Sequence, residues 1–403
     1  MTILYITSFY SPNEVGGIEV QTRAMAESMC EDHDVYLLCF DSSGKNSFDI
    51  INGVKVIRTY VPGLSDILLK RYLSRERQSK LKLFLTIFSW RINSHLKKAV
   101  KKVLRNTLEK NPEIIHFSSN FVQFNFANLL KTISKLYPYT PKIISIHDHF
   151  LLGRSTVPPN MRVLIWSLYK RKILAKYSLY YICPSTYFSN LIVEDLRKEN
   201  QFVLTLNHFI PFKYEIYPRK DDYIKILFAG NFEYQKGPDI VSRAFVDLFV
   251  LFPMKLKLYL VGDGEYRNVC EEILKEIPDE FKFFSSKLER EKLFQLMKQM
   301  DFVVVPSRYN ESFGLVAAEA ILAGALPIVS NKGGLPEVVN FVDDLIFINE
   351  PELFNLLKNL IVDKTKFHQL KIDIKSQLIK FSPENYKLKL NNFYSSIKLQ
   401  LQI

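Results

Sequence analysis

The order of apolar and amphipathic segments constrains the fold of this chain more than any other feature. Short apolar runs rich in Ile, Val, Phe and Tyr alternate with longer stretches whose apolar residues recur at helical spacing. Apolar strands separated by helices are typical of parallel, doubly wound sheets with helices on both faces. In the first half of the chain the expected strands are 2–9, 33–40, 54–61, 113–118, 142–147 and 180–184.

The second half of the chain repeats this alternation. The stretch 208–222 separates the two halves and contains Pro211, Pro218 and a charged run. A chain of 403 residues is too long for one ordinary core and predicts two domains of about 150–200 residues. We therefore predict an α/β protein with two Rossmann-like domains, residues 1–210 and 211–382, that face each other across a cleft. A helix over 383–403 is expected to pack back on the first domain. In the second half the expected strands are 225–230, 257–261, 282–284, 302–306, 326–330 and 345–348.

The strongest motif is a pair of glutamates in the loop and helix that follow the expected strand 302–306. Ligands bind outside the carboxyl ends of such strands, and a helix that begins near Gly314 offers unpaired amides and a positive dipole end to a diphosphate. Glu319 lies about one turn into this helix and could accept hydrogen bonds from two ribose hydroxyls. Glu311 precedes the helix and could hold sugar hydroxyls. The alternative is two acids that merely favour the helix dipole.

Three further motifs follow strands of the expected sheets. Lys236 lies between the first strand of the second domain and a Gly-Pro helix start, where a cation can neutralise a leaving pyrophosphate. Gly16 and Gly17 follow the first strand, and their amides can face an anion without interference from a side chain. His147 ends the strand 142–147, where an imidazole can hydrogen-bond a sugar hydroxyl. The alternatives are that Lys236 is a surface lysine, that Gly16 and Gly17 form an ordinary turn, and that His147 caps the next element.

Together these motifs resemble the donor-binding signature of family 4 glycosyltransferases, which have the two-domain GT-B fold. The resemblance extends over nearly the whole chain, because the motifs occur in the family's order. It implies that Glu311 contacts the donor sugar and Glu319 the ribose, and that His147, Lys236 and Glu311 serve the reaction. Asn231 stands where the family usually has Arg, and Asn brings no charge. The implied donor-binding residues are Gly16, Gly17, Asn231, Lys236, Glu311, Phe313, Gly314, Leu315 and Glu319.

The resemblance also implies a reaction. We expect transfer of a sugar, with retention of configuration, from a nucleoside-diphosphate sugar to a hydroxyl of a glycan or lipid-linked acceptor. UDP- and GDP-sugars are the expected donors, and the expected process is synthesis of cell-surface polysaccharide or glycolipid. No cofactor and no metal are expected, and the seven histidines are scattered along the sequence. The alternative is a non-catalytic GT-B scaffold or partner subunit at a membrane surface.

The positive charge of the chain is concentrated in one segment. The net charge is +12, and residues 70–105 contain twelve Lys or Arg and one acid. Leucines and aromatic residues are interleaved with these cations, which suits the surface of an anionic membrane, although a solvated helix face is the alternative. No nucleic-acid module accompanies the charge, so nucleic acid is not an expected partner.

The remaining features concern location. The four cysteines have no paired spacing, which is typical of a reducing compartment. The first residues resemble a buried strand and not a signal peptide, and the most apolar window, 81–92, is far shorter than the roughly 20 residues of a membrane span. We therefore expect a cytoplasmic protein that associates peripherally with the inner face of the membrane.

Overall fold

The chain forms two compact units. The computed structural model describes residues 1–11, 17–41, 43–62, 90–118, 126–147, 176–196, 203–212 and 222–401. The first unit comprises Met1–Cys183, Ser189–Leu206 and Lys387–Ile403, and the second comprises Pro184–Phe188 and Asn207–Tyr386. Gly16 and residues 70–89 of the basic segment lie outside the described residues.

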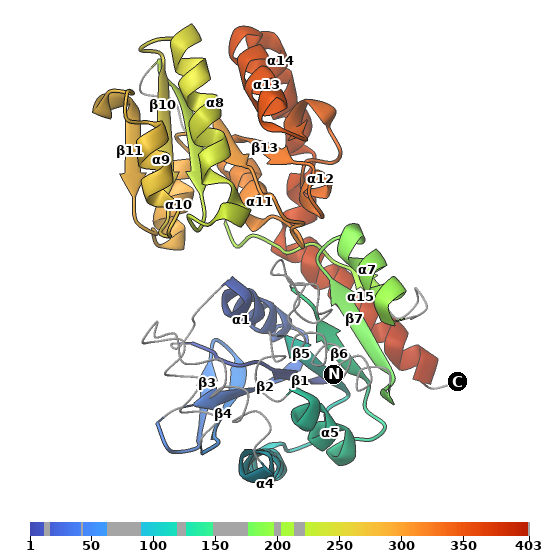
Figure 1. Ribbon diagram of the computed structural model, residues 1–403. Coiled ribbons are helices and arrows are strands. Elements are labelled where there is room, and N and C mark those ends of the chain that lie inside the picture. Colours follow the sequence, from blue (N-terminus) through green and yellow to red (C-terminus); the bar gives the residue numbers. More distant parts are fainter. Residues whose placement is uncertain are drawn as a thin grey trace. The chain divides into compact units, whose positions relative to one another are not determined.

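The first unit is built on an eight-stranded sheet with the order β3-β4-β2-β1-β5-β6-β7-β8 (Figure 1). All neighbouring strands run parallel except β3, which is antiparallel to β4. Each of the six strands expected in this half is present. Their bounds are β1 (Thr2–Ile6), β2 (Asp34–Asp41), β3 (Ser47–Ile51), β4 (Val54–Tyr60), β5 (Ile114–Ser118), β6 (Lys142–Ser145), β7 (Leu179–Cys183) and β8 (Val203–Thr205).

The edge strands β3 and β8 were not predicted from the sequence, and β3 runs antiparallel to its neighbour β4. Asn52 and Gly53 join β3 to β4 and both have positive φ, 48° and 85°. An Asn-Gly pair in this conformation makes the tight turn of a hairpin. Four of the five residues of β3 are exposed, so the strand lacks the buried apolar run by which the other strands were recognised.

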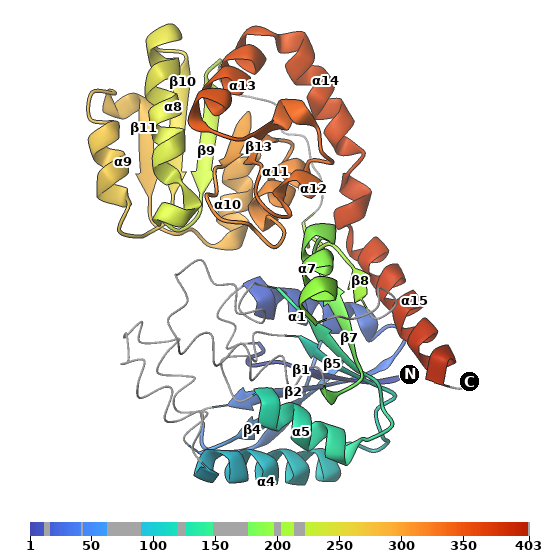
Figure 2. The same cartoon turned by 45° about the vertical axis from the view of Figure 1, so that its right-hand side comes forward.

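In the described part of the first unit, a helix follows each of the strands β1, β4, β5 and β7. Helices α4 and α5 contact each other, and Figures 1 and 2 both show them side by side. Helix α15 begins in the second unit and continues into the first, where Phe393 meets the ring of Tyr180 on β7 edge-on at 6.2 Å. The bounds are α1 (Gly17–Met29), α4 (Trp90–Thr107), α5 (Phe126–Leu136), α7 (Thr186–Leu196) and α15 (Pro383–Leu401).

A buried polar cluster joins α15 to the centre of the first sheet. The Tyr394 hydroxyl of α15 lies 3.0 Å from the Tyr5 hydroxyl on β1 and 2.6 Å from Nδ1 of His116 on β5. Nε2 of His116 lies 2.7 Å from the Ser145 hydroxyl on β6. Burial, together with the nearby His147, lowers the pKa of His116 to about 3. The imidazole is therefore neutral at physiological pH, and the Tyr394 hydroxyl contacts β1 and β5 directly and β6 through His116.

The second unit is built on a six-stranded parallel sheet with the order β11-β10-β9-β12-β13-β14. In order of sequence this is 3-2-1-4-5-6, the doubly wound arrangement in which the strand order reverses between the first and fourth strands. The reversal here lies between β9 and β12. The bounds are β9 (Ile224–Ala229), β10 (Leu256–Val261), β11 (Lys282–Ser285), β12 (Phe302–Val305), β13 (Leu326–Ser330) and β14 (Ile346–Phe347).

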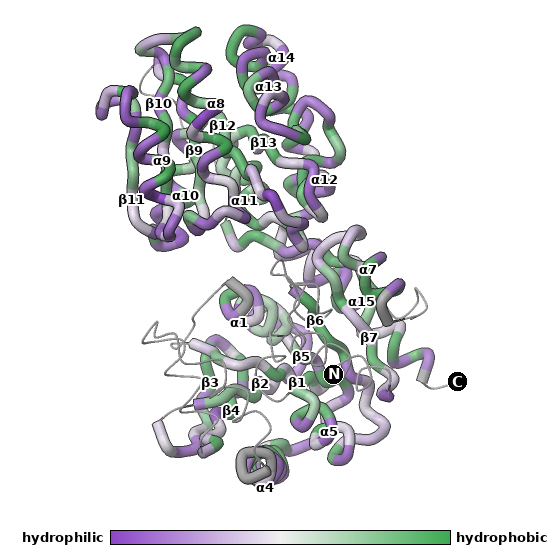
Figure 3. The backbone as a smooth tube through the Cα atoms, in the orientation of Figure 1, coloured by the Kyte–Doolittle hydropathy of each residue, from purple (hydrophilic) through white to green (hydrophobic). Residues whose placement is uncertain are grey.

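The helices of the second unit fall into two groups by their contacts. Helix α8 contacts α9 and α13, whereas α11 contacts α10, α12 and α14. Figure 3 shows hydrophobic residues concentrated along the strands between them. The bounds are α8 (Pro238–Leu251), α9 (Arg267–Ile273), α10 (Arg290–Met297), α11 (Leu315–Ala323), α12 (Leu335–Val338), α13 (Glu350–Val362) and α14 (Lys364–Lys375), with short 3-10 turns η4 (Tyr234–Lys236), η5 (Asp279–Phe281), η6 (Asp343–Leu345) and η7 (Leu378–Phe381).

Local sequence determines where several of these helices begin. Asn349 accepts a hydrogen bond from the Glu352 amide and so caps α13, and Asp363 does the same for α14 through the Lys366 amide. Helices α8 and α13 each have a proline in the first turn, where a backbone N–H has no partner within the helix. Among the helices that the structure describes, none combines the length and hydrophobicity that crossing a bilayer requires.

Candidate functional site

The site of interest lies in the second unit, where two loops leave the sheet at its point of reversal. One loop follows β9 and carries Lys236, and the other follows β12 and carries Glu311. The Arg308 amide donates a hydrogen bond to the Gln235 carbonyl at 2.8 Å, which joins the two loops through their backbones. Gly237 has φ 67°, and a Cβ there would lie 2.1 Å from the Pro306 carbonyl oxygen. Only glycine permits this approach.

Lys236 and Glu311, which the sequence places 75 residues apart, form an ion pair. Nζ of Lys236 lies 2.7 Å from Oε1 of Glu311, and the side chains are 29% and 14% exposed. The Tyr309 hydroxyl lies 2.6 Å from Nζ and donates to Oε2 of Glu311 at 3.0 Å. Ser307 donates its hydroxyl proton to Oε1 of Glu311 at 2.7 Å. The result is a compact, largely buried cluster of one cation, one anion and two hydroxyls, which we call the Lys236 cluster.

The charges of the Lys236 cluster reinforce one another. Burial opposes the charge of Lys236, but the attraction of Glu311 and Tyr309 and their hydrogen bonds outweigh it, so the lysine pKa is raised. Burial, and secondarily the Glu311 charge, raise the pKa of Tyr309 to about 12. At neutral pH Lys236 is therefore cationic and Tyr309 is a neutral hydroxyl. A second anion that approached Nζ would compete with Glu311 for the same charge.

Helix α11 begins directly beside this cluster. Gly314 has φ 119° and a Cβ on it would lie 2.5 Å from Cδ2 of Leu335, so the residue before the helix must be glycine. Phe313 is only 2% exposed and packs edge-on against His208 and Phe381. The side chain of Phe313 is thus part of the core, and a ligand at this helix start would meet backbone amides of residues 313–315 instead.

Glu319 lies in the second turn of α11 and is bound by an arginine that the sequence motifs did not indicate. Nε and Nη2 of Arg290, the first residue of α10, both lie 2.8 Å from Oε1 of Glu319. Glu319 is 7% exposed. Burial raises its pKa even though Arg290 acts in the opposite direction. Arg290 and Glu319 are 29 residues apart, so no local pattern could have predicted this pair.

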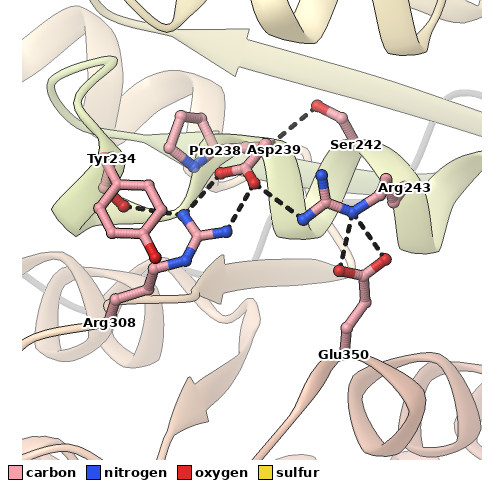
Figure 4. A network of polar contacts seen from close by, with 7 residues as sticks. All are labelled: Tyr234, Pro238, Asp239, Ser242, Arg243, Arg308 and Glu350. Atoms are coloured by element: carbon pink, nitrogen blue, oxygen red, sulfur yellow. Dashed lines mark hydrogen bonds and ion pairs between the residues drawn. The ribbon is translucent and has the colours of Figure 1, made fainter.

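A second ion network fixes the two loops to each other and to α13 (Figure 4). Arg308 binds both carboxylate oxygens of Asp239 at 2.7 and 2.5 Å, and its guanidinium lies 4.2 Å from the centre of the Tyr234 ring. Arg243 binds Asp239 at 2.8 Å and also both oxygens of Glu350. Burial opposes the charge of Asp239, but the two arginines outweigh it and lower its pKa. The network has no net charge and holds the backbones that carry Lys236 and Glu311.

Asn231 is exposed and lies on the first of the two loops. Its amide donates to Oε1 of Glu233 at 3.5 Å, which is a weak contact. Asn231 carries no charge, so Lys236 alone supplies the positive charge of the Lys236 cluster. Gly333 pairs with the backbone of Glu311, and the Gly334 amide donates to the Glu311 carbonyl at 2.8 Å.

The remaining predicted residues lie in the first unit. His147 follows β6 and is half-buried, with both ring nitrogens shielded from solvent. Burial lowers its pKa to about 4, so the imidazole is neutral at physiological pH. Gly17 is the first residue of α1, and Gly16 lies outside the described residues.

An Asp-x-Asp spacing in the first unit does not form a metal site. Asp34 pairs with Lys55 at 2.9 Å and Asp32 pairs with Lys387 at 2.8 Å. Both carboxylates are therefore engaged by lysines from different elements. Within the described ranges, no group of three or more His, Cys, Asp or Glu residues could hold a metal ion.

Comparison with known proteins shows similarity to glycosyltransferases. Residues 210–368 match the family described as glycosyl transferases group 1. The chain is 27% identical over 369 residues to an uncharacterized glycosyltransferase of Methanocaldococcus jannaschii, with 84% of this chain and 83% of that protein covered. It is 25% identical over 376 residues to an uncharacterized protein in the cps region of Klebsiella pneumoniae, with 87% and 90% covered.

Solved structures share the whole architecture. The Anabaena protein HepE in complex with UDP and glucose aligns over 98% of this chain and 99% of its own, with 15% identity and a TM-score of 0.68. At that identity the likeness shows the fold, and the predicted GT-B fold is confirmed. The matching segment 210–368 contains both loops of the Lys236 cluster and the whole of α11. The chain therefore has the GT-B fold, and its residues 210–368 match the group 1 glycosyl transferases.

Proposed function

We propose that the chain transfers a glycosyl group from a nucleoside-diphosphate sugar to a hydroxyl of a glycan or lipid-linked acceptor. The observation that carries this proposal is the Lys236 cluster, which lies at the reversal point of the second sheet beside the start of α11. Such a position combines a cation, free backbone amides and a helix dipole, which suits a diphosphate. A carboxylate in the same cluster suits the hydroxyls of a sugar attached to that diphosphate.

The contacts of Lys236 suggest how the donor would be used. When a diphosphate binds, its oxygens would take over Nζ of Lys236 and release Oε1 of Glu311 to accept a sugar hydroxyl proton. During transfer the bond from the anomeric carbon to the phosphate oxygen breaks and the acceptor oxygen bonds to that carbon. The acceptor proton passes to the leaving diphosphate, whose growing charge Lys236 would stabilise. We infer retention of configuration by displacement on one face, with no metal and no cofactor, and a role for His147 as a neutral hydrogen-bonding group.

The relatives support the finer parts of the proposal. HepE is described with UDP and glucose, which favours UDP-sugars, and GDP-sugars are the second candidate. A relative in a cps region favours a role in cell-surface polysaccharide synthesis. The alternative of a non-catalytic scaffold has one supporting observation, the uncharged Asn231 in the first loop. The intact ion pair between Lys236 and Glu311 argues for the enzyme.

A nucleotide screen tests the proposal directly. UDP, GDP and ADP are each added to the purified chain, and the midpoint of thermal unfolding is measured. At a concentration of 100 times its dissociation constant, a ligand stabilises the folded protein by about 2.7 kcal/mol. This corresponds to a rise of several degrees in the midpoint of thermal unfolding. We expect one of the three to raise the midpoint and a sugar attached to it to be transferred or hydrolysed. If none of the three has any effect, the scaffold interpretation is favoured instead.

We further propose that helix α4 contacts the headgroups of an anionic membrane. Leu96, Val100 and Leu104 are buried against the first unit, while Lys98, Lys102 and Arg105 are exposed. The exposed cations are spaced by four and three residues, so they share one face of the helix. Near an anionic bilayer each contributes about 1 kcal/mol of attraction.

Co-sedimentation with lipid vesicles tests this surface. The chain is expected to bind vesicles that contain phosphatidylglycerol and to be released by salt, because exposed charges are screened. Replacing Lys98, Lys102 and Arg105 together by glutamine should lower binding by at least about 10-fold. The matched control replaces Lys275, Lys292 and Lys358, which are exposed on the second unit. Equal loss in both triple variants would show a nonspecific charge effect and contradict the assignment.

A further inference from the structure

We propose that Arg290 positions Glu319 for the ribose of the donor, and that this pair makes the site select ribose over 2′-deoxyribose. The inference rests on the proposed function, because it concerns the nucleotide of that donor. Arg290 lies outside the motifs that identified the site. It is assigned as a positioning residue, since it would act on the ribose through the Glu319 carboxylate.

The geometry of the pair leaves one half of the carboxylate available. Both contacts from Arg290 end on Oε1 of Glu319: Nε donates a hydrogen bond at 2.8 Å, and Nη2 lies within ion-pair distance at 2.8 Å. Oε2 accepts no hydrogen bond from the part of the chain that the structure describes. An arginine that served only to neutralise a carboxylate would bind both oxygens, as Arg308 does on Asp239 at 2.7 and 2.5 Å. The arrangement on Glu319 holds the carboxylate in one orientation and keeps Oε2 for another donor.

The guanidinium of Arg290 is itself held in place. Its carbon lies 5.3 Å from the centre of the Phe212 ring, and Phe212 stacks on Phe294 with ring centres 4.2 Å apart and planes at 17°. Phe294 lies one turn after Arg290 on α10, so the helix supplies both the arginine and the base of the stack. A guanidinium fixed on one side by rings and on the other by a carboxylate loses little further freedom when a ligand binds.

The pair is not arranged for stability alone. Nη1 and Nη2 of Arg290 are buried, and neither donates a hydrogen bond to any residue that the structure describes. Buried donors that make no hydrogen bond destabilise the folded state. Replacing a buried ion pair with packed apolar residues is frequently neutral or stabilising, so the folded state alone gives no reason to retain it. A carboxylate held in a fixed orientation for a ligand does give such a reason.

Removal of Arg290 should change how Glu319 binds hydroxyls. Glu319 is 7% exposed, and without the arginine its burial would favour the protonated acid. A protonated carboxyl has fewer acceptor positions than a carboxylate, and nothing fixes its orientation. A ribose presents two hydroxyl donors to the pair, whereas 2′-deoxyribose presents one and leaves part of a buried acceptor unsatisfied. Sites that hydrogen-bond a hydroxyl reject the analogue that lacks it. We therefore expect the site to bind the ribonucleotide roughly 10- to 100-fold more tightly than its 2′-deoxy form.

The test measures nucleotide affinity and needs neither the sugar nor the acceptor. The nucleoside diphosphate that stabilises the wild type, UDP for example, is compared by calorimetry with its 2′-deoxy form. We expect the wild type to prefer the ribonucleotide about 10- to 100-fold. In Arg290→Met the preference should fall below about 3-fold, chiefly through weaker binding of the ribonucleotide. Arg290→Lys keeps the charge but loses the planar guanidinium that orients Glu319, so its preference for the ribonucleotide should be intermediate.

A matched control comes from another arginine of the same unit. Arg267 also pairs with a glutamate, Glu271 at 2.9 Å, and also lies over a ring, Phe284 at 5.3 Å. Arg267→Met should leave the preference for ribose unchanged. An unchanged preference in Arg290→Met overturns the inference, and if that variant does not fold, an unchanged preference in Arg290→Lys does so. Failure of the wild type to bind any of the three nucleotides would instead contradict the proposed function.

Discussion

Replacing Lys236 with methionine is expected to lower the rate of glycosyl transfer by about 100- to 1,000-fold, as removal of a single stabilising donor does in other active sites. Lys236 supplies the positive charge of the Lys236 cluster, and its position beside α11 aims that charge at a diphosphate. The change removes stabilisation that grows during bond cleavage, so kcat should fall more than KM rises. Steady-state rates with the donor found in the nucleotide screen provide the measurement.

Two companion variants separate chemistry from folding. Glu311→Gln keeps the shape of the side chain and one acceptor oxygen, but it removes the negative charge and the second acceptor, and it should raise KM for the donor sugar. Lys366→Met removes a lysine that pairs with Asp344 at 2.5 Å elsewhere in the second unit, and should leave kcat unchanged. If Lys236→Met retained wild-type kcat, Lys236 would have no part in the reaction, and the assignment of the cluster would be wrong.

The second large effect concerns stability. Tyr394→Ala is expected to destabilise the first unit by about 3–5 kcal/mol, the range for buried aromatic residues that are cut back to alanine. Tyr394 is fully buried, and its hydroxyl reaches both Tyr5 and His116. Tyr394→Phe keeps the ring and removes one hydrogen bond from His116, so it should cost about 1–3 kcal/mol. The difference between the two variants measures the packing of the ring.

Urea unfolding followed by tryptophan fluorescence reads the first unit alone. The two tryptophans of the chain are Trp90 and Trp166, and both fall within Met1–Cys183. Tyr139→Ala is the control, because Tyr139 is 93% exposed and its loss should change stability by less than about 0.5 kcal/mol. An unfolding midpoint for Tyr394→Ala equal to that of the wild type would mean that α15 does not stabilise this sheet.

The sequence predicted those features that depend on the ends of parallel strands. The strands β9 and β12 are short, buried and apolar, so both could be recognised. Because parallel strands present their carboxyl ends at one edge, the loops with Lys236 and Glu311 lie at the same edge of the sheet although 75 residues separate them. The observed ion pair at 2.7 Å is the physical result of that topology.

Other features depend on which side chains happen to pack together, and sequence spacing carries no signal for them. Tyr309 lies two residues before Glu311, but its bond to Lys236 requires the folded loop. Arg290 reaches Glu319 only because α10 and α11 are in contact. The burial of Phe313 under His208 and Phe381 likewise arises from distant segments. By contrast β3 did have a local signal, the Asn52-Gly53 turn, which a search limited to apolar runs overlooks.

The course of α15 has a consequence for how the protein is made. The first unit includes Met1, yet its last segment starts at Lys387 within α15, and the whole of Asn207–Tyr386 lies between. A ribosome that adds about 5–20 residues per second needs roughly 10–40 s to cross that interval. During this time the strands that carry Tyr5 and His116 have been synthesised but lack the Tyr394 hydroxyl that contacts both residues. The half of the protein that is synthesised first therefore completes its buried polar cluster only after the second unit has been made.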